Sequence, residues 1–184
     1  MKMKLNYYVT IATLALVLLF SQANAQSDFQ EKNLEKLALK LFKAQKYSDA
    51  LPVYLQLDNM SKDAIKYDYM IGMCYLSTSS KEKALPYFLS AKNHPETSFV
   101  INYYLGRAYM IEESYAEAKN YLTIYSDSLT NYIASTGLKF KNESITEANR
   151  FHMEKSLNHV QEFVNECSAY LEENKEQVSA STKK

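Results

Sequence analysis

Apolar and polar positions alternate along the chain with the period of an α-helix. Leu34, Ala38 and Leu41 lie three or four residues apart, which is the spacing of one helical face. After a short polar turn, a second apolar stripe runs from Ala50 to Leu57. The pattern predicts two consecutive amphipathic helices joined by a tight connection.

This helix pair recurs twice along the chain without a gap. Gly106 steps back by 34 residues to Gly72, and by 34 again to Ala38. A period of this size predicts stacked helical units, each of which buries its apolar face only against its neighbours. The three copies occupy about residues 30–61, 62–95 and 97–126.

Small residues are expected where the two helices of one copy cross. Helix axes approach to about 8–10 Å only where the facing side chains are small. The pattern therefore pairs Gly72 with Ala84, and Gly106 with Ala118. The six expected packing residues are Ala38, Ala50, Gly72, Ala84, Gly106 and Ala118.

The period ends after residue 126. Residues 127–142 contain serine, threonine, asparagine and a glycine, and predict an irregular or short helical connection. A capping box begins at Ser144 and opens an amphipathic helix across residues 143–175. Such a helix closes the last apolar surface of a stack. Residues 176–184 predict a disordered polar tail.

The N-terminus has the order of a secretory signal. Lys2 and Lys4 precede an apolar run, which is followed by the small residues Ala23 and Ala25. This order predicts a signal peptide of residues 1–25, and hence an exported, periplasmic protein, either free or associated with the outer membrane. The alternative is an uncleaved anchor, but spanning a bilayer takes roughly 20 apolar residues.

The charge balance narrows the class of partner. The chain has 21 basic and 21 acidic side chains, so removal of Lys2 and Lys4 leaves 19 against 21, a net charge of −2. This balance, without basic blocks, argues against nucleic acid and against direct membrane binding. We expect a protein or peptide partner, with membrane contact only through that partner.

Motifs for catalysis or cofactor binding are missing from the sequence. It has no glycine-rich phosphate loop and no nucleophile motif. His159, Glu162 and Cys167 share one helix, but their spacing favours a solvated face over a metal site. We therefore expect no enzyme activity, cofactor, metal or small-molecule substrate. Whether Cys74 and Cys167 pair stays open, although an exported chain allows a disulfide.

The repeating unit resembles the tetratricopeptide repeat family. In Gly72, Tyr75, Ala84 and Phe88, a small residue is followed by an aromatic, an alanine and a bulky residue at the family's spacing. The resemblance covers residues 30–126. It implies an all-α, right-handed solenoid of three helix hairpins closed by a long C-terminal helix.

The resemblance also implies where a partner binds. In this family the partner lies in a concave groove lined by the first helix of each copy. Carried over to this sequence, the groove residues are Leu39, Phe42, Tyr69, Met73, Leu76, Tyr103, Arg107, Met110 and Ile111. Such an apolar, aromatic groove with one arginine suits an extended or helical peptide. Alternatively, the C-terminal helix covers these residues or they pack within the stack.

Two functional hypotheses follow. The first is a non-enzymatic adaptor of the periplasm or outer membrane that binds an envelope protein through this groove. The second is a structural subunit of a large outer-membrane assembly, docked by its convex face and terminal helix. The segments Tyr104–Tyr109 and Lys83–Tyr87 also look like the N-terminal repeat region of exported Bacteroidota envelope proteins that serve in secretion or gliding.

Overall fold

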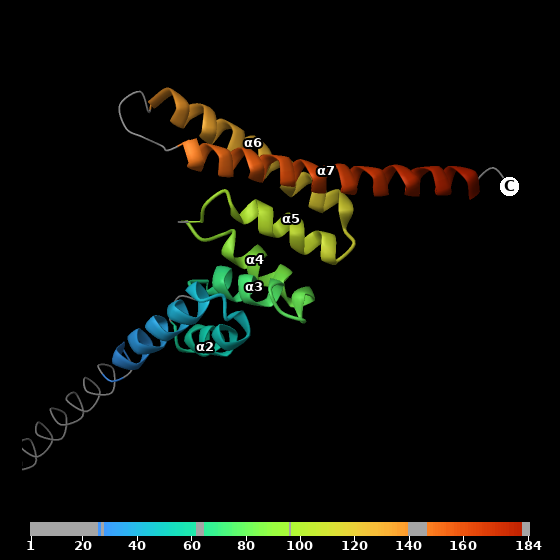
Figure 1. Ribbon diagram of the computed structural model, residues 1–184. Coiled ribbons are helices and arrows are strands. Elements are labelled where there is room, and N and C mark those ends of the chain that lie inside the picture. Colours follow the sequence, from blue (N-terminus) through green and yellow to red (C-terminus); the bar gives the residue numbers. More distant parts are fainter. Residues whose placement is uncertain (1–25, 27, 62–64, 96, 140–146, 182–184) are drawn as a thin grey trace, which may run out of the picture.

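In the computed structural model, the chain folds into a stack of helices (Figure 1). The structure describes residues 26, 28–61, 65–95, 97–139 and 147–181. No strand occurs in these ranges, so the predicted all-α class is confirmed. The elements are a first helix at residues 28–43, α2 (Tyr47–Met60), α3 (Asp68–Leu76), a 3-10 helix (Lys81–Lys83), α4 (Ala84–Ala91), α5 (Ile101–Ile111), α6 (Tyr115–Lys139) and α7 (Glu147–Ser181).

Some sequence predictions fall outside the described ranges. They include the signal peptide of residues 1–25 and the start of the capping box at Ser144. The last three residues of the chain lie outside as well. These predictions stay predictions.

Each helix packs mainly on its neighbours in sequence, as a helical stack requires. Contacts join α2 to α3, α3 to α4, α4 to α5, α5 to α6, and α6 to α7. Three buried clusters lie along the stack. The first contains Tyr54 and Leu57, the second Phe88 and Leu105, and the third is centred on Leu122. The core is therefore a series of adjoining layers.

The period of the sequence is visible in the backbone. The second helical segment of each copy begins at Tyr47, Lys81 and Tyr115. These starting points are 34 residues apart, since 81 − 47 and 115 − 81 are both 34. The three copies therefore turn at equivalent places.

Two of the turns end a helix with a residue in the left-handed conformation. Gln45 has φ 58° and Glu113 has φ 55°, and they are the non-glycine residues with positive φ in the described chain. The amide of Lys46 donates to the carbonyl five residues earlier at 3.0 Å, and that of Ser114 does the same at 2.9 Å. This pattern is the Schellman motif, which satisfies carbonyls at a helix end.

The structure shows which atoms lie closest to the two packing glycines. A Cβ atom added at Gly72 would lie 2.7 Å from Cε1 of Phe88, and one at Gly106 would lie 2.5 Å from Cγ of Leu122. Each glycine thus faces the bulky residue that lies four positions beyond the alanine. The bulky side chain fills the space that a missing Cβ leaves. The backbone oxygen of Ala118 also lies 3.2 Å from the Cβ added at Gly106, which agrees with the predicted pair of Gly106 and Ala118. All six small residues are buried.

Residues 127–139 form a helix, so the helical one of the two predicted alternatives for this connection holds as far as Lys139. They continue α6, because Leu129 is buried and Ile133 packs against the third cluster. The hydroxyl of Thr130 donates to the carbonyl of Ser126 at 2.9 Å, inside the helix. Packing against α7 therefore overrides the weak helix propensity of the serines, threonines and glycine here.

The C-terminal helix is also longer than predicted. α7 ends at Ser181, so residues 176–181 are helical where the sequence predicts a disordered tail. Glu176, Gln177 and Ala180 in this stretch are good helix formers. With 35 residues, α7 is about 52 Å long. It packs along α6 and projects past the start of that helix (Figure 1).

The contact at Gly106 makes a stability prediction. In Gly106→Ala, the new methyl group would press on Leu122 and on a backbone oxygen. Overpacking costs about 1–3 kcal/mol, and the better helix propensity of alanine returns about 1 kcal/mol. We expect urea denaturation to show a lower free energy of unfolding.

The first copy offers the matched control, because Ala38 already stands at the equivalent position and is fully buried. The methyl group of Ala38 is already accommodated in the packing, so its removal in Ala38→Gly should lower the free energy of unfolding as well. A gain in stability from Gly106→Ala would contradict the contact described above.

The left-handed turns make a second prediction. A non-glycine residue in this conformation costs roughly 1 kcal/mol relative to glycine. Glu113→Gly should therefore raise the free energy of unfolding by about that amount. The control is Ser79→Gly, since Ser79 occupies the equivalent turn position without a positive φ. Thermal melts should separate the two variants, and equal shifts would refute the explanation.

Candidate functional site

The first helix of each copy lies beside the first helix of the next copy. Lys66, just before α3, binds Glu35 of the first helix at 2.6 Å. Tyr69 of α3 and Tyr104 of α5 contact with ring centroids 5.6 Å apart. Tyr103 of α5 contacts Phe163 of α7 at 6.5 Å. We call this row, formed by the first helix, α3, α5 and α7, the first-helix face.

A polar network ties the beginning of this face together. The hydroxyl of Tyr67 donates to Oε1 of Glu35 at 2.6 Å and to Glu31 at 3.1 Å. Hydrogen bonds from Lys66 and Tyr67 lower the pKa of Glu35. Burial, followed by the hydrogen bond to Glu35, raises the pKa of Tyr67. The charge of Lys66 is therefore compensated by glutamates of the same chain.

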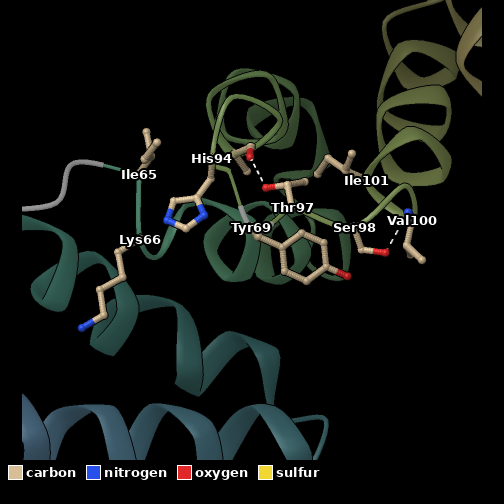
Figure 2. A pocket seen from close by; sticks show the side chains of 9 residues that line it. Ile65, Lys66, Tyr69, His94, Thr97, Ser98, Val100 and Ile101 are labelled. Carbon is tan, nitrogen blue, oxygen red and sulfur yellow. Dashed lines mark hydrogen bonds between the residues drawn. The ribbon is translucent and has the colours of Figure 1, made fainter.

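A cleft of about 430 Å³ opens between α3 and α5 on this face (Figure 2). Tyr69 of α3 and Ile101 of α5 lie in its wall, and the segments that precede these two helices supply the rest, apart from Ala91 of α4. Its volume lies within the range of pockets that hold small ligands or peptide side chains. The lining residues are Ile65, Lys66, Tyr69, Ala91, His94, Thr97, Ser98, Val100 and Ile101.

Hydrogen bonds within the chain position Thr97 and Ser98, whose hydroxyl groups line the cleft. Thr97 Oγ1 donates to the carbonyl of Ala91 at 2.6 Å, and the amide of Val100 approaches Ser98 Oγ at 3.5 Å (Figure 2). Burial raises the pKa of Tyr69, so its phenol stays neutral at physiological pH. The cleft thus combines apolar side chains and hydroxyl groups with the ammonium of Lys66 and the imidazole of His94.

Arg107 lies on the same side of α5 as the cleft. Val100, Tyr103 and Arg107 are spaced by three and four residues, which places them on one helical face. The guanidinium lies 5.8 Å from the centroid of the Tyr103 ring. Arg107 is the sole charged residue of α5 and makes no ion pair with a described residue.

The predicted groove residues divide into three groups in the structure. Leu39 and Ile111 are exposed, by 42% and 36%. Phe42, Tyr69, Met73 and Arg107 are half-buried.

The third group is covered. Leu76 is 8% exposed and belongs to the second cluster, so the prediction that it faces a groove is corrected. Its position at the end of α3 directs it toward the α4 packing layer. Tyr103 and Met110 pack against the third cluster, which α7 completes with Val160 and Cys167. Tyr103 contacts Phe163 of α7, so the alternative that α7 covers part of the predicted groove agrees with the structure at this residue.

Of the nine predicted groove residues, Tyr69 lines the cleft. The sequence prediction missed two cleft residues, Lys66 and Val100, which lie one helical turn before Tyr69 and Tyr103. A usable signal was present, because Lys66 and Val100 are themselves 34 residues apart and lie one turn before Tyr69 and Tyr103. Extending the repeat register by one turn would have found these two cleft residues.

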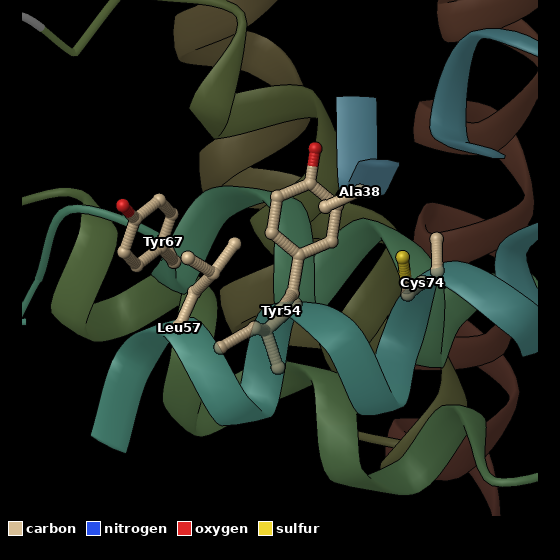
Figure 3. Close-up of a cluster of buried hydrophobic side chains, with 7 residues drawn as sticks. Ala38, Tyr54, Leu57, Tyr67 and Cys74 are labelled. Carbon is tan, nitrogen blue, oxygen red and sulfur yellow. The ribbon is translucent and has the colours of Figure 1, made fainter. Parts of the chain in front are cut away.

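Other reactive side chains make no site in the described ranges. Cys74 and Cys167 are free and buried in different clusters, Cys74 beside Tyr54 and Leu57 in the first (Figure 3). His159 and Glu162 form an exposed pair at 3.5 Å. No group of three metal-binding residues occurs among the described residues. In the same part of the chain, no helix has the length and apolar character needed to cross a bilayer.

Comparison with known proteins places the fold. No family model and no curated protein sequence matches the chain. The structure is similar to that of the type III secretion chaperone SycD of Yersinia enterocolitica, solved in complex with a peptide of the translocator YopD. The TM-score is 0.53 at 13% identity, over 76% of this chain and 92% of the chaperone. The chain thus has an all-α, tetratricopeptide-like helical repeat fold.

Proposed function

We propose that this protein is a non-enzymatic adaptor that binds a segment of another protein on its first-helix face. The observation that carries the proposal is the cleft between α3 and α5, with Arg107 beyond it on the same side. A recess with apolar and aromatic side chains, beside one arginine, has the composition of a peptide-binding surface.

The structural comparison supports this proposal through the fold. SycD was solved with a peptide of a partner protein, and its helical architecture extends over most of the present chain. The likeness concerns architecture, so which residues contact a partner is argued from the cleft itself. The partner class, a protein or peptide, agrees with the near-neutral charge.

We also propose that the adaptor works in the cell envelope. The N-terminal pattern that ends at Ala25 supports export to the periplasm. The local resemblance to Bacteroidota envelope proteins supports a partner in the envelope, and with it an association with the outer membrane through that partner.

One observation favours a second candidate, a structural subunit of an envelope assembly. α7 continues past Tyr170, which stacks on Tyr115 near the start of α6 at 3.9 Å. Residues 172–176 of this extension are exposed. A long projecting helix offers a docking element that is separate from the cleft.

The export proposal predicts a processed N-terminus. Expressed in a bacterial host that recognises its signal, the full chain should yield a mature protein that begins at Gln26. Intact-mass spectrometry and N-terminal sequencing of the periplasmic fraction check this. A chain that retains residues 1–25 and stays with the inner membrane would support the anchor alternative.

The adaptor proposal predicts which surface changes abolish partner capture. Leu39→Glu and Arg107→Glu each alter the first-helix face at a side chain outside the buried clusters. Both should reduce capture of the native partner from detergent-solubilised envelopes at least tenfold, because a desolvated charge or a reversed charge opposes binding. Quantitative mass spectrometry of the captured proteins measures the loss.

The matched control is Ile124→Glu on α6, which changes a side chain with 41% exposure, close to that of Leu39. It should leave capture unchanged. The opposite result, with loss in Ile124→Glu and none in the other two, would refute face recognition and favour the structural subunit.

A further inference from the structure

The charges on the first-helix face are unevenly distributed around the cleft. α3 contains one charged residue, Asp68, which is 4% exposed, and α5 contains Arg107. Lys66 is compensated by Glu31 and Glu35. Among the described residues of α3 and α5, Arg107 therefore has a positive charge that no ion pair compensates.

A partner that covers this face has to offer the guanidinium of Arg107 a favourable interaction. Arg107 is half-buried and lies over the ring of Tyr103, and water solvates the exposed part of its guanidinium in the free protein. A purely apolar segment would displace this water and leave a cation without a partner, which is strongly unfavourable. A carboxylate would replace the water with charge-assisted hydrogen bonds.

We propose that the recognised segment carries an aliphatic anchor for the cleft and an acidic residue that pairs with Arg107. The proposal rests on the adaptor function and specifies the chemistry of its partner. The anchor lies between Tyr69 and Val100, and the carboxylate binds the guanidinium over Tyr103. A C-terminal carboxylate and an aspartate or glutamate share this chemistry, and peptides distinguish them.

The geometry of α5 sets the spacing between the two groups. Val100 and Arg107 are seven residues apart, which corresponds to about 10 Å along a helix. The guanidinium lies over Tyr103, three residues from Val100, so the lower limit is about 5 Å. An extended peptide advances about 3.3 Å per residue. The acidic residue should therefore lie two or three positions from the anchor, in either chain direction.

Defined peptides test this spacing. Fluorescein-labelled peptides of alanine and serine carry one leucine, with one glutamate placed at each position from five before it to five after it. Each peptide has a control in which glutamine replaces the glutamate. A further set compares peptides that end in a free C-terminal carboxylate with the same peptides ending in an amide. Fluorescence anisotropy with the full chain gives the dissociation constants.

We expect the tightest binding with glutamate two or three positions from leucine, about tenfold tighter than with glutamine there. Arg107→Gln should bind the glutamate and glutamine versions equally, and Arg107→Glu should bind the glutamine version more tightly than the glutamate version. A preference for the free C-terminus over an internal glutamate would overturn the assignment of the carboxylate to an acidic side chain.

Ser98→Phe separates failure of this inference from failure of the adaptor proposal. Ser98 is exposed and lines the cleft, so phenylalanine should block the cleft without removing a buried contact. If this variant abolishes binding while glutamate and glutamine peptides bind the natural chain equally, the acidic pairing is wrong and the cleft stands. If no peptide binds, or Ser98→Phe binds as the natural chain does, both proposals fail.

Discussion

The close approach of Phe88 to Gly72 is the contact on which the cleft depends. A Cβ at Gly72 would lie within 2.7 Å of the Phe88 ring, so the ring occupies the space that any larger residue would need. On its other side, Phe88 stacks on Tyr104 at 5.6 Å and contacts Tyr69 at 6.3 Å. Tyr69 is a wall of the cleft. A packing contact inside the second copy thereby positions a side chain of the site.

The same arrangement explains why repeated layers can hold a surface of this kind. Each layer is closed by a bulky side chain from one helix against a small residue of another, at Gly72 and again at Gly106. Protein interiors are densely packed, so this contact tolerates little change. The aromatic rings that extend from it, Tyr69 and Tyr104, then touch across the two copies. The packing contacts that stabilise the stack therefore also determine the shape of the first-helix face.

The repeat was readable from the sequence because its cause is local and periodic. Helix starts follow the 34-residue register, and all six small residues are buried. That Phe88 and Leu122 lie closest to the two glycines was not predicted, because only the crossing geometry decides which side chain fills that space. The extension of α6 through Leu129 depended on α7, which lies far along the chain. Tertiary packing decided that segment against local propensity.

The site was predicted in part, for a related reason. Repeat positions identify which residues share a face, and Tyr69 and Arg107 do lie on one side of the stack. They do not identify which of those residues a terminal helix covers, as α7 does with Tyr103.

Arg107 occupies the border between the covered and the open part of this face. A lysine there would present a compact, strongly hydrated charge, whereas a guanidinium stacks on an aromatic ring and still offers donors to a carboxylate. The stacking on Tyr103, at 5.8 Å, orients the guanidinium before any partner arrives. An oriented donor loses less conformational entropy on binding than a free one, so the ring contact favours recognition. Because α7 holds Tyr103 through Phe163, the C-terminal helix contributes to this site through the ring on which the arginine lies.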